Sequence, residues 1–154
     1  MPTRESIEIR EAEARDLPAL LDLYRHLQPD DPEIDAALAK SRFEQIRAQP
    51  GMLLFLAVTD GIPVATITLV IIPNLTRGAA PYALIENVVT DAAYRHRGYA
   101  GALIRHGIDQ AWAAGCYKVM LLSGSKNPAT LGFYLNCGFV QDKTGFQIRR
   151  PASL

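Results

Sequence analysis

The segment with the most distinctive chemistry is a short loop rich in arginine and glycine, Tyr94-Arg95-His96-Arg97-Gly98-Tyr99-Ala100. It follows an apolar run, residues 84–90, and opens a run with the periodicity of an amphipathic helix. A chain that passes from a strand into a helix through such a loop points several backbone N–H groups at one place, and the helix dipole adds partial positive charge. Gly98 and Ala100 are small enough to let a ligand approach the backbone closely. The loop therefore predicts a site for a diphosphate; the simpler alternative is a helix start with solvated arginines.

A single carboxylate interrupts the apolar run just before this loop. Glu86 lies within residues 83–89, Ala-Leu-Ile-Glu-Asn-Val-Val, where burial of a charge is costly unless the charge has a partner or a function. Because side chains alternate along a strand, two faces are expected: Leu84, Glu86, Val88 and Thr90 on one, and Ile85, Asn87 and Val89 on the other. The alternative to a functional Glu86 is a carboxylate held by a neighbouring arginine or a backbone group.

Periodicity and turn residues predict the elements that must position these groups. An Asp60-Gly61 turn predicts a hairpin between residues 52–59 and 62–72. Asp16 is expected to cap the first helix, and Gly115 to end the helix after the arginine loop. The full set of expected elements is strands at 7–10, 52–59, 62–72, 82–90, 117–122, from 138 and at 146–149, helices at 17–27, 33–49, after residue 98 and at 127–136, and a loop at 74–81. This order predicts an α+β fold with a mostly antiparallel sheet and one crossover that carries the loop.

Composition limits the classes of protein to consider. The chain has 154 residues, of which 49% are hydrophobic, and this suits one globular domain. Its 16 Lys and Arg balance 16 Asp and Glu, whereas a nucleic-acid binder normally carries a basic surplus, so no nucleic-acid partner is expected. The most apolar segment, residues 64–72, is too short to cross a bilayer and no signal peptide is visible. Two cysteines at this spacing predict neither a disulfide scaffold nor a metal site. A soluble cytoplasmic protein without a membrane partner is expected.

Three features in order, Glu86, the spacing Arg95-x-x-Gly98-x-Ala100 and the segment from Asn127 to Tyr134, make the chain resemble the GNAT N-acetyltransferases. The element order also matches the GNAT fold, a mixed, mostly antiparallel central sheet flanked by about four helices. The resemblance covers nearly the whole chain, so a single GNAT domain over residues 1–154 is expected.

This resemblance implies acetyl-CoA as the acetyl donor. It implies that backbone groups of the loop bind the pyrophosphate, and that backbone groups of Val88 and Val89 bind the pantetheine amides. The loop residues concerned are Arg95, His96, Arg97, Gly98, Tyr99 and Ala100.

The resemblance also implies roles for three side chains. Glu86 would take a proton from the acceptor ammonium, directly or through water, since only the neutral amine is nucleophilic. Asn127 would contact the cofactor arm, and Tyr134 would donate to the leaving thiolate. A packing role in an amphipathic helix is the alternative for Tyr134. No cysteine has a histidine placed to activate it, which favours direct attack by the amine, and His26 and His106 are expected on exposed helix faces.

Within the superfamily, the chain resembles the glucosamine-6-phosphate N-acetyltransferases. The similar segments are residues 85–89 (Ile-Glu-Asn-Val-Val), 115–119 (Gly-Cys-Tyr-Lys-Val), 133–139 and 147–150. That family usually carries a carboxylate near the amino sugar, where this chain has Leu122-Ser123-Gly124, and its segment between the Asn and the Tyr is shorter. The sugar phosphate therefore stays one candidate among others.

Three functions remain open from the sequence: acetylation of a small-molecule amine, which we favour, a non-catalytic acyl-CoA-binding module, and acetylation of a protein amine. The acceptor site is expected between residues 24–43, the loop 74–81 and the segment after Leu122. Asp30 and Asp31 would suit a cationic amine, and Arg77 an anionic group. A homodimer through the C-terminal strands is compatible with the sequence, although no residue demonstrates it.

Overall fold

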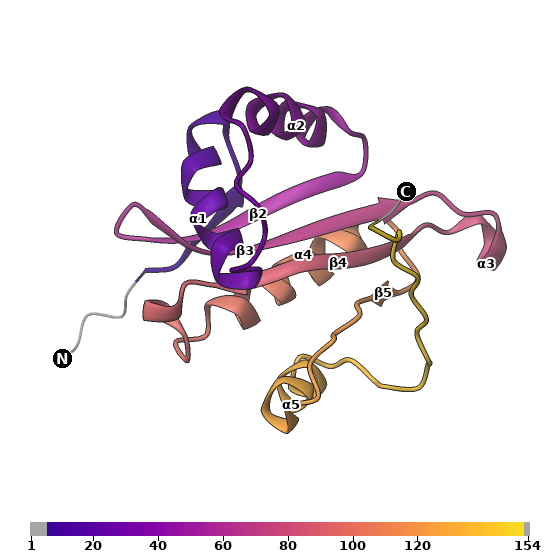
Figure 1. Ribbon diagram of the computed structural model, residues 1–154. Coiled ribbons are helices and arrows are strands. Elements are labelled where there is room, and N and C mark those ends of the chain that lie inside the picture. Colours follow the sequence, from indigo (N-terminus) through magenta and orange to yellow (C-terminus); the bar gives the residue numbers. More distant parts are fainter. Residues whose placement is uncertain (1–5, 153–154) are drawn as a thin grey trace. The chain divides into compact units, whose positions relative to one another are not determined.

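The computed structural model describes residues 6–152 (Figure 1). These residues fall into two compact units, one up to Leu121 and one from Leu122. The prediction of a single domain over residues 1–154 is not tested by this division and stays a prediction.

The first unit is built on a five-stranded sheet in the order β1-β2-β3-β4-β5. Its neighbours pair antiparallel except β4 and β5, which are parallel. The strands are β1 (Glu8–Glu11), β2 (Met52–Thr59), β3 (Ile62–Ile72), β4 (Tyr82–Thr90) and β5 (Val119–Met120). Asp60 and Gly61 both have positive φ, +48° and +76°, as a type I′ turn requires, and the expected β2–β3 hairpin is confirmed.

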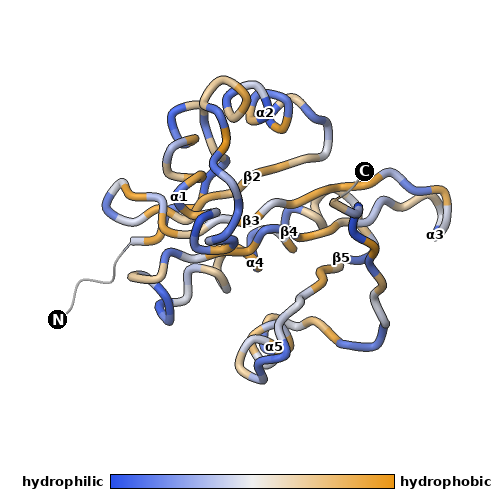
Figure 2. The backbone as a smooth tube through the Cα atoms, in the orientation of Figure 1, coloured by the Kyte–Doolittle hydropathy of each residue, from blue (hydrophilic) through white to orange (hydrophobic). Residues whose placement is uncertain are grey.

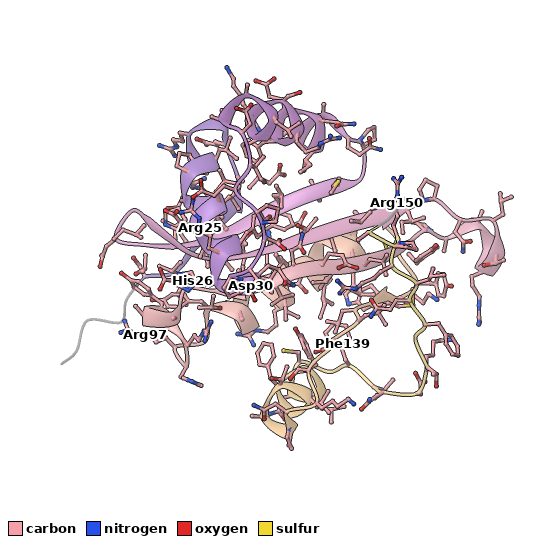
Figure 3. The ribbon with its side chains drawn as sticks, viewed as in Figure 1. Arg25, His26, Asp30, Arg97, Phe139 and Arg150 are labelled. Atoms are coloured by element: carbon pink, nitrogen blue, oxygen red, sulfur yellow. The ribbon has the colours of Figure 1, made fainter. Side chains whose placement is uncertain are left out.

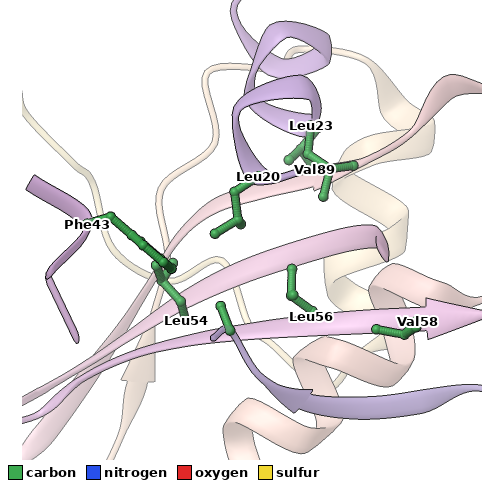
Figure 4. Close-up of a cluster of buried hydrophobic side chains, with 8 residues drawn as sticks. Leu20, Leu23, Phe43, Leu54, Leu56, Val58 and Val89 are labelled. Carbon is green, nitrogen blue, oxygen red and sulfur yellow. The ribbon is translucent and has the colours of Figure 1, made fainter. Parts of the chain in front are cut away.

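Helices cover both faces of this sheet. One face is covered by α1 (Leu17–Leu27) and α2 (Ala36–Ala48), and the other by α4 (Tyr99–Ala113) (Figure 1). The helices α1 and α2 cover a cluster of buried apolar side chains that come from α1, α2, β2, β4 and the residue after β1 (Figure 4): Ala12, Leu20, Leu23, Phe43, Leu54, Leu56, Val58 and Val89. The alternate residues of β2 and β3 face α4, and this is why these strands are hydrophobic along nearly their whole length (Figure 2).

The start of α1 differs from the expectation. Asp16 was predicted to cap this helix, but its carboxylate makes no hydrogen bond to the first-turn amides. It is buried instead, and it accepts two hydrogen bonds from Arg10 of β1, at 2.7 and 2.9 Å, and one from the Glu13 amide at 2.7 Å. The guanidinium of Arg10 holds the pKa of Asp16 below its ordinary value. The Asp16 carboxylate therefore pairs with the guanidinium of Arg10 in β1 and not with the amides of its own helix.

The predicted loop 74–81 contains one helical turn, α3 (Thr76–Ala79). The chain passes through it with positive φ at Arg77, Gly78 and Ala79, which prevents the helix from continuing. The Nδ2 amide of Asn74 donates to the side chain of Thr76 and to the carbonyl of Ala80, and so closes the turn.

The second unit contains α5 (Pro128–Asn136), as predicted, and its described residues, 122–152, contain no strand. The expected strands from residue 138 and at 146–149 are therefore wrong, and β5 is shorter than the predicted 117–122. Alternating apolar residues form a strand only where a neighbouring strand pairs with the backbone, and Phe146 and Ile148 are 91% and 97% exposed. Across residues 6–152, no helix is long and apolar enough to cross a membrane, and no cluster of side chains suits a metal ion.

Candidate active site

The central feature of the site is a β-bulge in β4. Thr66 pairs with Val89, and Thr68 pairs with Glu86. The two pairs are therefore two positions apart along β3 but three positions apart along β4. Asn87 supplies the extra residue, with φ at +51°, in the left-handed region that asparagine tolerates better than most residues. The side chains of cross-strand neighbours lie on the same face of a sheet, so Glu86 and Val89 both face α1 and α2. The alternation predicted beyond Glu86, with Val89 on the face of Ile85, is therefore wrong.

Glu86 is exposed beside this bulge. Within residues 6–152, its carboxylate has neither a hydrogen bond nor an ion pair. The alternative in which an arginine or a backbone group holds Glu86 is thus not what the structure describes. A carboxylate without a protein partner remains available to accept a proton from a ligand or from water.

The outer edge of β4 is open next to Glu86. The parallel strand β5 pairs only with Ala83 and Leu84, at the beginning of β4. From Ile85 onward, the part of the chain that the structure describes places no strand against this edge. Backbone groups around Val88 and Val89 are therefore in a position to pair with an extended ligand, as those of an edge strand do.

The arginine-rich loop follows directly. Asp91 caps the 3₁₀ turn η2 (Ala92–Tyr94) by accepting from the Ala93 amide at 2.8 Å. The Nε of Arg95 lies 3.4 Å from the carbonyl oxygen of Thr90, which ties the loop to the end of β4. His96 and Gly98 both have positive φ, +63° and +86°, and these two residues turn the chain into α4.

The N-terminus of α4 has no side-chain cap. The Ala102 amide donates to the carbonyl of Gly98 and closes the first turn, whereas the amides of Ala100 and Gly101 precede any acceptor in their own helix. A Cβ built on Gly98 would meet no atom within 4 Å, so the space in front of the helix is unfilled. Uncapped amides and the positive end of the dipole together form a site suited to an anion.

The aromatic side chains of the loop anchor it to the fold. Tyr99 is 1% exposed and makes an edge contact with Tyr94, with ring centroids 6.3 Å apart. The Arg97 guanidinium lies over the Tyr94 ring at 5.3 Å and is near the tip of the loop (Figure 3). Tyr99 therefore holds the loop through its side chain, and only its backbone is in a position to serve a ligand.

Asn127 and Tyr134 lie in the other unit, on α5. Asn127 is the N-cap of α5, and its Oδ1 accepts from the Ala129 amide at 3.0 Å, which leaves the Nδ2 hydrogens to donate elsewhere. Tyr134 is half-buried between Phe133 and Phe139, with ring centroids 5.1 and 6.3 Å from its own. Burial, and secondarily Cys137, raises the pKa of the Tyr134 phenol, so this group keeps its proton at neutral pH.

Sequence reasoning missed one buried polar residue near Glu86. Thr68 is the cross-strand neighbour of Glu86 and is 2% exposed. It belongs to a β-branched run that indicates a strand and nothing more, so no sequence signal marked this residue. Tyr24, expected on the apolar face of its helix, packs against the buried cluster, and burial raises its pKa.

The two histidines on helices behave differently from each other. His26, at the end of α1, lies 3.8 Å from the carboxylate of Asp91 and is exposed, as expected (Figure 3). His106 was also expected on an exposed face, and this is wrong: it is half-buried, with its ring edge-on to Phe55 at 4.7 Å. Cys116 is buried and Cys137 half-buried, and among the described residues neither forms a disulfide.

Two surface hollows lie apart from these residues. One of about 500 Å³ is bounded by β1, the end of α2 and the start of β2, and one of about 390 Å³ is bounded by residues near Pro50, Ile71 and Ala79. Neither is lined by a predicted catalytic or cofactor-binding residue, but the second is lined by Asn74, Ala79 and Pro81 of the loop 74–81, where part of the acceptor site was expected.

Comparison with known proteins gives consistent matches. The model of the Acetyltransferase (GNAT) family matches residues 20–139. A glucosamine 6-phosphate N-acetyltransferase of Trypanosoma brucei brucei is 35% identical over 133 residues, which cover 86% of this chain and 88% of that protein. A structure from Agrobacterium tumefaciens str. C58, provisionally described as an acetyltransferase, is 55% identical, with a TM-score of 0.90 over 93% of this chain and 99% of that one.

A third similar structure, the aminoglycoside N-acetyltransferase AAC(6')-Iy in complex with CoA, has a TM-score of 0.80 at 20% identity, over 97% of this chain and 98% of that one, which shows a shared fold. GNAT acetyltransferases use acetyl-CoA as the donor. The chain belongs to the GNAT family of acetyltransferases and is an acetyl-CoA-dependent N-acetyltransferase.

Proposed function

We propose that the protein transfers the acetyl group of acetyl-CoA directly to a primary amine of a small molecule, with Glu86 as the group that receives the amine proton. The observation that carries this proposal is the exposed, unpartnered carboxylate beside the bulge of β4. It lies on the same strand as the open edge at Val88 and Val89, a few residues before the arginine-rich loop.

The cofactor would extend along this strand. The uncapped start of α4, with the loop from Arg95 to Ala100, would bind the pyrophosphate through backbone amides. The pantetheine arm would pair with Val88 and Val89 at the open edge of β4. With the pyrophosphate at the loop, the arm would run back along β4 from the loop toward Glu86. The thioester at the end of the arm would then lie near Glu86.

The reaction then needs three proton transfers. Glu86 would take a proton from the acceptor ammonium, directly or through water, and the neutral amine would attack the acetyl carbonyl. The new C–N bond forms as the C–S bond breaks, the thiolate would receive a proton from the Tyr134 phenol, and the second proton that the nitrogen loses on becoming an amide would return to the Tyr134 phenolate. Asn127 would contact the cofactor arm through its Nδ2 hydrogens.

The acceptor we favour is an amino sugar phosphate or a related small amine. The T. brucei relative supports this class at 35% identity. One difference argues against glucosamine 6-phosphate itself as the acceptor. The segment Leu122-Ser123-Gly124 has no carboxylate, whereas the sugar-phosphate enzymes usually carry one there. Substrate identity would therefore be established by a panel: glucosamine 6-phosphate, glucosamine, spermidine and sisomicin, with release of CoA thiol as the signal.

The first experiment separates cofactor binding from chemistry. Thermal unfolding with acetyl-CoA, with adenosine diphosphate as control ligand, is expected to show stabilisation of about 2.7 kcal/mol at a hundred times Kd. Glu86→Gln should keep this stabilisation and lose turnover of the best amine. A chain that binds acetyl-CoA but acetylates no amine would favour the non-catalytic module, and one that acetylates only a protein amine would favour the third candidate.

A homodimer and a cytoplasmic location remain predictions. Size-exclusion chromatography with light scattering measures the first, and localisation of a tagged chain measures the second.

A further inference from the structure

The end of α1 lies beside the start of the arginine-rich loop. His26, in the last turn of α1, places its Nε2 atom 3.8 Å from Oδ2 of Asp91, the residue that follows β4. This distance is longer than a hydrogen bond but within the range in which an imidazolium and a carboxylate form an ion pair. The side chains of His26 and Asp91 are each 34% exposed, whereas those of the Arg25–Asp22 pair on the same helix are 66% and 70% exposed. Solvent therefore screens the His26–Asp91 pair less.

Asp91 is the residue at which the chain turns from β4 into the loop. Its amide donates to the carbonyl of Val64 at 2.8 Å, and its own carbonyl accepts from the Tyr94 amide at 2.9 Å. Its Oδ1 accepts from the Ala93 amide at 2.8 Å, whereas Oδ2 is the oxygen that faces His26. The carboxylate can therefore cap the turn η2 with one oxygen and bind an imidazolium with the other.

The turn η2 is in contact with the start of α4. The ring of Tyr94 makes an edge contact with Tyr99, and the guanidinium of Arg97 lies over the same ring. A movement of Asp91 would therefore reach the loop and the uncapped amides of α4. The end of α1 also begins the segment 24–43, where part of the acceptor site is expected. The His26–Asp91 pair thus joins the expected acceptor side of the molecule to the cofactor loop.

Other charged groups surround His26. On α1, Asp22 and Arg25 pair with each other at 2.9 Å. The elements that pack most closely against α1 are η1 (Ala14–Asp16), β3 and β4, and β3 has no ionisable side chain. The ionisable side chains of the other neighbouring segments are Arg15 and Asp16 of η1, Tyr82 and Glu86 of β4, Asp30 and Asp31 after α1, and Arg95, His96 and Arg97 of the loop. Within residues 6–152, Asp91 is the one carboxylate within 4.0 Å of the His26 imidazole.

We propose that His26 is a positioning residue for acetyl-CoA: its imidazolium pairs with Asp91 and holds η2 in the conformation from which the loop presents its backbone amides to the pyrophosphate. Acetyl-CoA therefore binds more tightly when His26 carries a proton than when it is neutral. Because histidine side chains change charge between about pH 5 and pH 8, the affinity rises as the pH falls through this range. This inference rests on the proposed binding of the pyrophosphate by the loop, and it does not involve Glu86.

The test measures the Kd of acetyl-CoA by calorimetric titration at about pH 5.5 and about pH 8, at constant ionic strength. The proteins are the wild type, His26→Gln, Asp91→Asn, the double variant and Arg25→Gln. Asp91→Asn keeps an oxygen for the Ala93 amide and removes the charge. Arg25→Gln is the matched control, because it removes a positive charge from the same helix turn and Arg25 pairs with Asp22. If Asp91→Asn does not fold, Asp91→Ser replaces it, since serine also caps helix starts without a charge.

The expected result is a difference in pH dependence. The 3′-phosphate of the ligand and His96 also titrate in this range, but both are present with every variant, so the comparison uses the ratio of the two Kd values in each protein. At the lower pH we expect the wild type to bind acetyl-CoA roughly two- to fourfold more tightly than His26→Gln, the size of a partly exposed ion pair, and about equally at pH 8. Asp91→Asn and the double variant should show the same ratio as His26→Gln, because each removes the same pair. Arg25→Gln should keep the wild-type ratio.

Three outcomes would contradict the proposal in different ways. An equal Kd ratio in the wild type and His26→Gln, with binding lost in Gly98→Trp, would overturn the role of His26 and leave the loop assignment standing. An effect of His26→Gln that persists undiminished in the Asp91→Asn background would mean that the imidazolium acts on the ligand directly and not through Asp91. Unchanged acetyl-CoA affinity in Gly98→Trp would overturn the loop assignment and this inference with it.

Discussion

Ile85 and Val89 lie on opposite faces of the sheet although they are four positions apart along β4, a spacing that would put them on the same face of a regular strand. Ile85 is buried on the side of α4, where its Cδ1 would lie 3.7 Å from a Cβ built on Gly107, and Val89 belongs to the cluster under α1 and α2. The bulge at Asn87 causes this change of face. It also lets Glu86 and Val89 share the face of α1. The chemistry proposed for Glu86 therefore depends on the backbone conformation of its neighbour.

The first prediction concerns Asn87. Asn87→Val places a β-branched side chain at φ +51°, which should cost about 1–2 kcal/mol of unfolding free energy and disturb the register at Glu86. Asn87→Gly, which accepts this φ without strain, is the control. We expect kcat/KM for the amine to fall strongly in the valine variant and little in the glycine variant, with unfolding measured by denaturant. Equal activity in the two would mean that the bulge conformation does not matter for Glu86.

The sequence predicted the elements that carry strong local signals. The β2–β3 hairpin follows from Asp60-Gly61, and the end of α4 from Gly115, because these residues accept backbone conformations that others resist. The loop from Arg95 to Gly98 was predicted for the same reason.

Features that depend on distant partners were not predicted. No glycine marks the bulge at Asn87, and the choice of Asp16 between a helix cap and Arg10 is decided by how β1 lies beside it. The strands expected from residue 138 and at 146–149 are absent. Alternation of apolar and polar residues does not form a strand unless a neighbouring strand pairs with the backbone.

The second prediction concerns the start of α4. Gly98→Trp should abolish acetyl-CoA binding, because the side chain would occupy the space in front of the uncapped amides. The positive φ of Gly98, +86°, adds a strain of roughly 1–2 kcal/mol that is unrelated to the ligand. Gly115→Trp is the matched control, because Gly115 has φ +83° and open space at the other end of the same helix. The control should lose similar stability and keep the thermal shift with acetyl-CoA; an equal loss of the shift in both variants would refute the loop assignment.

The third prediction concerns acid stability. The pKa of Asp16 is lowered from its ordinary value of 3.8, chiefly by the hydrogen bond from Arg10. The ion pair therefore contributes its full stabilisation to the fold at pH values above 3.8. That contribution should be lost as the pH falls below this value toward the lowered pKa of the folded state. Asp16→Asn cannot titrate, so it should be less stable than the wild type at pH 7, and the difference should shrink below pH 3.8. Urea denaturation from pH 7 to pH 2.5 measures this; a constant difference across the range would contradict the assigned pair.

The last prediction concerns Tyr134. Burial raises the pKa of its phenol above 10.0, so the folded protein keeps the proton donor intact throughout the neutral range. Tyr134→Phe retains the ring contacts with Phe133 and Phe139 and removes only the hydroxyl. We expect kcat to fall by roughly 10²-fold, as for the loss of a proton donor, while the Kd of acetyl-CoA changes little. Stopped-flow turnover and calorimetric titration of acetyl-CoA measure the two quantities separately. A loss confined to acetyl-CoA binding would instead assign Tyr134 to packing, because a donor to the leaving thiolate acts only as the C–S bond breaks.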